Sequence, residues 1–181
     1  MMSSSRHAAS LLAAAALWGS IPTLPHPAER LPIEEVATTA LALHQAGRAG
    51  ESLPYFRRLV RELGNDWRVH NDYSAALHNA AQEGRARLGK VDPVARSSYE
   101  RVQMERESLK ELALAERLAP TALDSVTVII SRAQRFQTWG FPLDALREVE
   151  RTRRLAPASR SVPAYVEQVL SLLRSAQGAG R

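Results

Sequence analysis

The spacing of apolar residues along most of the chain is that of amphipathic helices. After residue 32, apolar side chains return every three or four positions, which places them on one face of a helix. The run VTVII, from Val126 to Ile130, could suggest a strand, but the helical spacing continues through Ala133 and Phe136. We therefore expect an all-α fold. The predicted helices cover about 33–46, 51–63, 66–82, 93–118, 123–139, 142–155 and 163–175.

Turn-forming residues set the expected helix ends. Gly50 is expected to supply the turn between the first two helices, and Pro54 to lie in the first turn of the second, where a missing N–H does little harm. Ala46 and Leu63 are expected on the core-facing sides of these helices. The remaining expected caps and breaks are Asn65 or Asp66 before the third helix, Thr121 before the fifth, and Gly140 with Pro142 between the fifth and sixth.

Two distant segments share the offsets of their small, bulky and turn-forming residues. Gly47 is followed five and nine positions later by Ser52 and Phe56. After Gly140, the same offsets hold Ala145 and Val149. The later marker positions are Gly64 in the first segment, and Thr152 and Pro157 in the second.

This pattern resembles the tetratricopeptide repeat, a helix-turn-helix unit of about 34 residues. The resemblance implies an α-solenoid of about three helix pairs over residues 33–176, closed by a capping helix at the C-terminus. Counted from Trp67, the proline of the second unit would fall near position 98, but the matching residue is Pro120. We therefore expect an insertion at about 83–103, a polar turn followed by the projecting first half of a long helix.

Composition and motifs give no indication of catalysis. The chain has no cysteine, which removes disulfides, thiolate nucleophiles and cysteine-bound metals. His70 and His78 are eight positions apart, or about 12 Å along a helix, too far to share one metal ion. There is no phosphate-binding glycine loop, nucleophile elbow or HExxH motif. We expect no catalytic residue, no cofactor and no metal site.

The net charge of +5 comes mainly from arginines that are interleaved with acids. In the long helix, Arg106 and Arg117 alternate with Glu107 and Glu116, which is typical of a solvated helix face. A nucleic-acid interface is a weaker hypothesis. It rests on the basic cluster of Arg85, Arg87, Lys90 and Arg96.

The first 28 residues differ from the rest of the chain. They contain no Asp or Glu and include an apolar run of 11 residues, from Ala8 to Trp18, too short to span a bilayer. The segment resembles a secretory signal peptide, which implies export to the periplasm or the medium, with cleavage between Gly19 and Glu29. An Ala-rich N-terminal extension is the alternative. Residues 29–32 are expected to form a proline-rich linker and 177–181 a frayed tail.

The resemblance also implies a function, the binding of a protein or peptide. In this family the first helix of each pair lines a concave groove, and its polar residues contact the partner. The alternative is a structural subunit that assembles through the projecting helix, with Tyr99 and Met104 on its contact surface. The groove candidates are Arg68, Asn71, His78 and Asn79 on the third helix, His44 and Gln45 on the first, and Gln134 and Gln137 on the fifth.

Overall fold

The computed structural model describes residues 26–88, 94–156 and 171, and within them the regular structure is entirely helical. This confirms the all-α expectation, including a helix rather than a strand at Val126 to Ile130. A short 3-10 turn, η2 (Pro27–Glu29), precedes the α-helices. These are α1 (Ile33–Gln45), α2 (Ala49–Glu62), α3 (Trp67–Leu88), α4 (Val94–Leu118), α5 (Ala122–Thr138) and α6 (Pro142–Leu155).

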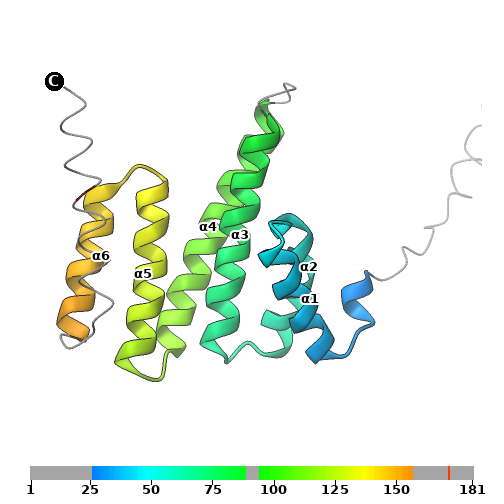
Figure 1. Ribbon diagram of the computed structural model, residues 1–181, viewed down its shortest axis with the longest axis horizontal. Helices are drawn as coiled ribbons and strands as arrows, with labels where there is room; N and C mark the ends of the chain where they lie inside the picture. Colours follow the sequence, from blue (N-terminus) through cyan, green and yellow to red (C-terminus); the bar gives the residue numbers. More distant parts are fainter. Residues whose placement is uncertain (1–25, 89–93, 157–170, 172–181) are drawn as a thin grey trace, which may run out of the picture.

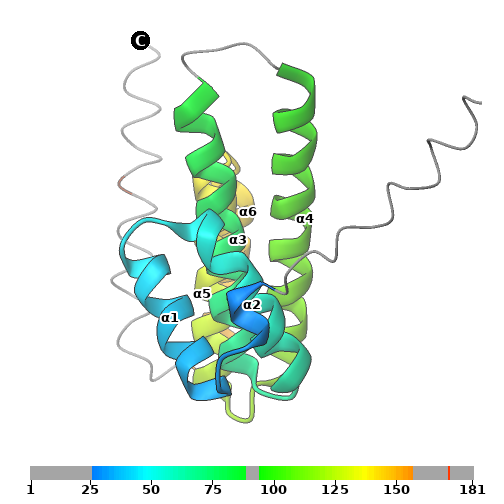
Figure 2. The ribbon, with the colours of Figure 1, turned by 90° about the vertical axis from the view of Figure 1, so that its right-hand side faces the viewer.

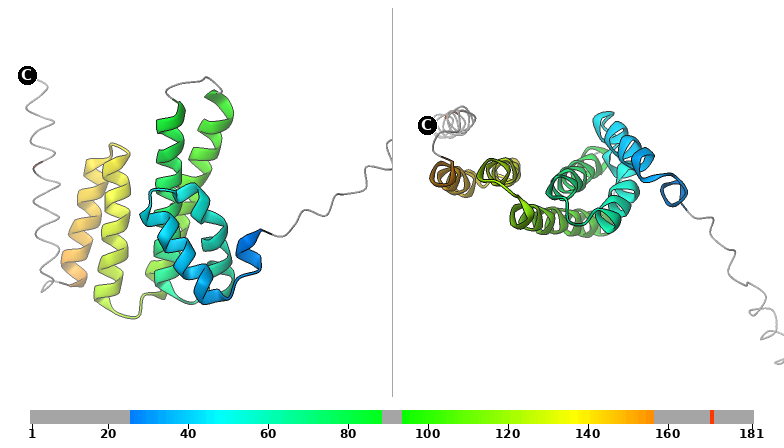
Figure 3. Two further views of the ribbon diagram at one scale, coloured as in Figure 1. Left: turned by 45° about the vertical axis from the view of Figure 1, so that its right-hand side comes forward. Right: turned by 90° about the horizontal axis from the view of Figure 1, so that it is seen from below.

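Each α-helix packs antiparallel against the next one in the chain. Each helix contacts the next one in the chain, and Figures 1 and 3 together show that the helices follow one another along a curved row. The contact between α3 and α4 is the most extensive, and the ends of both helices extend past the others (Figures 1 and 2). The described part of the predicted insertion therefore lengthens two paired helices.

Small residues lie where the helices of a pair cross. Ser74 on α3 and Ser108 on α4 are both fully buried, and their hydroxyl oxygens are 2.9 Å apart. Small side chains let two helix backbones approach closely, and larger apolar residues beside them fill the space that remains. Ala40 and Ser52, and likewise Ala133 and Ala145, are buried in the other two helix pairs. The bulkier buried residues that follow are Phe56, Leu112 and Val149.

Glycine ends the first helix of two pairs in the same way. Gly47 and Gly140 have φ angles of 70° and 83°, which L side chains rarely adopt. In both turns the residue after the glycine donates its N–H to a carbonyl five residues back, at 2.9 Å and 2.8 Å. Gly50 lies inside α2, so the prediction that it forms the turn was wrong.

Alanine replaces this glycine in the middle pair. Ala81 follows Ser74 by seven positions, as Gly47 follows Ala40 and Gly140 follows Ala133. Alanine is the strongest helix former, and α3 continues past it to Leu88. The polar turn predicted from residue 83 onward is therefore helical as far as residue 88.

Several residues near the helix ends do not lie where the sequence predicted them. Because α2 begins at Ala49, Pro54 is its sixth residue and lies beyond the first turn. Ala46 and Leu63 are exposed C-cap residues, so their predicted core positions were wrong. The predicted caps Asp66 and Thr121 are correct: Asp66 accepts from the N–H of Arg68 at 2.9 Å, and Thr121 from that of Asp124 at 3.2 Å.

Residues 26–32 pack against α2 rather than forming an extended linker. Ala28 is buried, and the Arg58 guanidinium donates to the carbonyls of Ala28 and Leu31. Arg61 forms an ion pair with Glu29 at 2.8 Å. The rest of the predicted signal peptide, the helix predicted at 163–175 apart from residue 171, and the tail at 177–181 lie outside the described residues.

Candidate functional site

The candidate residues lie on α1, α3 and α5, the first helix of each pair. Side chains bridge these helices directly. Asn79 on α3 reaches His44 on α1, with 3.5 Å between Nδ2 and Nε2. His78 on α3 lies beside Trp139 at the end of α5, with 6.1 Å between ring centroids. These two contacts link α3 to α1 and to the end of α5, and we call the side of these three helices that carries the candidate residues the inner face.

Arg68 is the most accessible of the charged candidates. Its side chain is 68% exposed, and its guanidinium lies 5.3 Å from the centre of the Trp67 ring. The carboxylate of Asp66 is 3.9 Å away, at the edge of ion-pair range. Exposed contacts of this kind hold a guanidinium only weakly, so Arg68 is available to another acceptor.

The middle of the inner face carries polar atoms with unused hydrogen-bonding capacity. Nδ1 of His44 and Oδ1 of Asn71 are sealed from solvent and have no hydrogen-bond partner. Beside them, burial raises the pKa of Asp72, an effect partly offset by hydrogen bonding to Asn71 and by nearby His44. Sequence reasoning missed Asp72 because it follows Asn71 without any motif. Asn79 and Gln45 are exposed.

His78 is buried instead of being presented to a groove. It is only 5% exposed, and its Nδ1 has no hydrogen-bond partner. Burial, together with the positive charge of Arg135, lowers its pKa from 6.5 to about 4, so the ring is neutral at pH 7. The expectation that His78 is an accessible contact was therefore wrong, because Trp139 covers it from α5.

The α5 part of the inner face is shallow. Gln134 is exposed and lines a hollow of about 400 Å³ together with Thr127 and Ile130. Gln137 is half-buried. Sequence reasoning missed two other residues of α5 and its cap, Arg135 and Trp139, which the packing brings against α3.

The alternative contact surface on the long helix divides into two environments. Tyr99 is 66% exposed and Val102 is 37% exposed. Met104 is half-buried and packs against the core cluster that contains Phe56 and Leu77. Tyr99 and Met104 therefore do not share one exposed patch.

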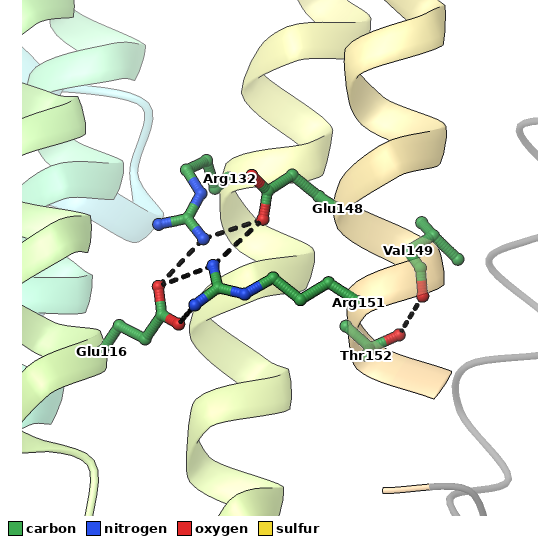
Figure 4. Close-up of polar contacts among 6 residues, drawn as sticks. All are labelled: Glu116, Arg132, Glu148, Val149, Arg151 and Thr152. Carbon is green, nitrogen blue, oxygen red and sulfur yellow. Dashed lines mark hydrogen bonds and ion pairs between the residues drawn. The ribbon is translucent and has the colours of Figure 1, made fainter. Parts of the chain in front are cut away.

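Acids of α4 that were expected in solvent bind to neighbouring helices. Glu107 accepts from the hydroxyl of Tyr73 at 2.7 Å, and Glu111 lies 2.6 Å from Nδ1 of buried His70. Glu116 joins α4 to the last helix pair: Arg132 of α5 bonds to Glu116 at 2.9 Å and to Glu148 of α6 at 2.8 Å (Figure 4). Arg151 also pairs with Glu116. These ion pairs hold α4, α5 and α6 together, because Arg132 and Arg151 both contact Glu116 and Glu148.

The described residues contain no group of three metal-ligating side chains that could hold an ion. None of the described helices is long and apolar enough to cross a membrane. In comparisons with protein-family models, with curated proteins and with solved structures, nothing matches this chain.

Proposed function

We propose that the chain is a non-enzymatic protein-interaction module, a tetratricopeptide-like α-solenoid that holds a peptide or protein segment on its inner face. The repeat interpretation is supported by burial at equivalent offsets. Ala40, Ser74 and Ala133 on the first helices are all buried, as are Ser52, Ser108 and Ala145 on the second helices. Ala40 and Ser74, at equivalent positions of the first two helix pairs, lie 34 positions apart in the sequence.

The main observation behind the proposed function is the contrast between the two sides of the helix pairs. Acids of α4 and α6 are paired with neighbouring helices. On the inner face, His44 and Asn71 keep unmatched polar atoms beside exposed Asn79. Arg68 and Asn79 are exposed on the inner face and can bond to an incoming chain, so an extended polypeptide with its own N–H and C=O groups suits this face.

A double substitution tests the proposal. We expect Arg68→Ala with Asn79→Ala to weaken partner capture at least tenfold, because arginine anchors commonly contribute more than ~2 kcal/mol to an interface. Both side chains are exposed, so helicity and melting temperature should stay nearly unchanged. The matched control is Arg106→Ala with Lys110→Ala, two exposed residues of α4. Equal capture by wild type and the inner-face variant in a quantitative pull-down would reject the proposal.

The second candidate function is a structural subunit that assembles through the extended α3–α4 pair. Exposed Tyr99 and Val102 favour it. Tyr99→Ala with Met104→Ala would abolish assembly under this hypothesis, but Met104 also supports the core. Tyr99→Ser with Val102→Ser is the cleaner variant. If this variant loses partner capture while Arg68→Ala with Asn79→Ala keeps it, the chain is a structural subunit.

We also propose that the chain is exported and that its mature form begins between about Gly19 and Ala28, within the range of Gly19 to Glu29 that the sequence predicts. Cleavage after Ala28 would remove a buried residue and the carbonyl that Arg58 binds. Intact-mass measurement of the native protein tests this. A full-length chain, or one that begins after Ala28, would contradict it.

A further inference from the structure

The solvent side of α4 carries a row of exposed side chains without an acid among them. Between residues 101 and 118, each exposed residue of α4 lies three or four positions from the next, so these side chains share one face of the helix. Together with Tyr99, one turn earlier, they form a row about 27 Å long by the helical rise per residue. We call this row the outer stripe, and its residues are Tyr99, Val102, Arg106, Lys110, Ala113 and Arg117.

The acids of α4 lie on its other sides. Glu107 and Glu111 bond to side chains of α3, and Glu116 bonds to arginines of α5 and α6. Glu105 is half-buried, and exposed Glu100 is turned about 100° away from Tyr99 around the helix axis. The packing of α4 therefore draws its carboxylates toward neighbouring helices and leaves its cations on the solvent side.

The three cations of the outer stripe are available to an external anion. Within the described part of the chain, Arg106, Lys110 and Arg117 form no ion pair. Exposed arginines of the other second helices differ in this respect, because Arg61 of α2 pairs with an acid and so does Arg147 of α6. The outer stripe is thus a positively charged surface that the described residues do not neutralise.

The shape and chemistry of the outer stripe suit the surface of an anionic lipid bilayer. Figure 2 shows α4 along one side of the described helices, extending past α1 and α2, so a flat surface can approach it. Lipid phosphates attract Lys and Arg, and tyrosine is enriched among the headgroups of bilayers. A nucleic-acid backbone would also attract the cations, but an aliphatic side chain such as Val102 gains nothing against a chain of phosphates.

We propose that the outer stripe binds the anionic headgroups of a lipid bilayer. The apolar side of α4 packs on α3 and α5, so the contact is peripheral and electrostatic rather than an insertion of the helix. Ser108 lies on the side of α4 opposite the outer stripe and contacts Ser74 of α3. The inner face, to which α3 belongs, would then point away from the bilayer and stay open to a polypeptide.

Sedimentation with lipid vesicles tests the proposal on the purified full chain. One set of vesicles contains phosphatidylcholine alone, and the other contains equal parts of phosphatidylcholine and phosphatidylglycerol. We expect the chain to bind the anionic vesicles at low ionic strength and to bind at least tenfold more weakly at about 0.5 M salt, where charges are screened within a few ångströms. Binding to phosphatidylcholine alone measures any contribution of the apolar run from Ala8 to Trp18.

Two variants with the same loss of charge locate the binding surface. Arg106→Ala with Lys110→Ala should weaken binding to the anionic vesicles at least tenfold, because each cation near such a surface contributes about fivefold. Arg30→Ala with Arg48→Ala removes two exposed cations that are not on α4, and its binding should stay within about twofold of wild type. All four side chains are exposed, so helicity should be retained in both variants.

Three results would overturn the inference. They are equal binding to both kinds of vesicle, including none to either, an equal loss of binding in the two variants, and tighter binding of a duplex oligonucleotide than of anionic vesicles. The last result would make the outer stripe a nucleic-acid surface. The assay contains no polypeptide partner, so the inference can fail while loss of partner capture by Arg68→Ala with Asn79→Ala still supports the proposed function.

Discussion

Ser74 and Ser108 meet hydroxyl to hydroxyl, 2.9 Å apart, where α3 crosses α4. Ser108 also lies within 3.0 Å of the carbonyl of Ser74, and both side chains are fully buried. This contact joins residues 34 positions apart and fixes the register of the two longest helices. His78 and Asn79, which contact α5 and α1, lie one turn further along α3.

A larger side chain at this crossing should separate the helices. We expect Ser108→Leu to lower the free energy of unfolding by about 1–3 kcal/mol or more, because the buried site has no room for added methylenes. Ser108→Ala keeps the volume and should cost about 1 kcal/mol, the typical value of one hydrogen bond. Urea titrations compare the two variants. Equal stability of the leucine variant and wild type would mean that the crossing is not closely packed.

Phe56 is the largest fully buried side chain of the first core cluster. Its ring stacks with Tyr73 at 6.3 Å and meets His44 edge-on at 6.2 Å between centroids. Phe56→Ala should therefore cost ~3–5 kcal/mol, as expected for emptying a buried aromatic site. A denaturant melt measures this. A change below ~1 kcal/mol would contradict the packing and the repeat register derived from it.

The arginine–glutamate network should be sensitive to the loss of its centre. Arg132→Met would leave Glu116 and Glu148, both largely buried, with half-exposed Arg151 as their cation, at a cost of about 1–3 kcal/mol. The triple variant with Glu116→Gln and Glu148→Gln should recover much of that loss, because it removes both buried carboxylates and leaves Arg151, whose side chain is 47% exposed to solvent. Thermal melts of both variants test this. A triple variant less stable than Arg132→Met would mean that the arginine contributes mainly by packing.

His78 should make stability depend on pH. Its pKa is lowered to about 4 in the folded chain, so between pH 6.5 and 4 the unfolded state binds the proton and the folded state does not. Stability should thus be fully present above pH 6.5 and fall as the pH drops toward 4. The full effect is about 3 kcal/mol by the usual conversion.

The matched control for this pH effect is His78→Gln, which cannot titrate. Its stability should change less than that of wild type between pH 6.5 and 4.5, and Arg135 stays charged throughout this range. Urea midpoints at several pH values provide the comparison. Parallel curves for the two proteins would show that His78 is not the titrating group.

The sequence predicted the local features of the fold because their causes are local. Gly47 and Gly140 are recognisable in the sequence as residues that can take a positive φ angle. Thr121 caps α5 by accepting from the N–H of Asp124, only three positions away. The same logic failed at Gly84, which was read as part of a turn. It lies inside α3, since packing against α4 outweighs the roughly 1 kcal/mol that a glycine costs a helix.

Only the tertiary structure decided which polar residues are buried and what they meet. Glu107, Glu111 and Glu116 occur in a charged stretch that is indistinguishable from a solvated face until α3 and α5 pack against it. Arg135 and His78 are 57 positions apart and share no motif. Their proximity follows from how α5 stacks on α3, and desolvation at that contact gives both side chains their unusual electrostatics.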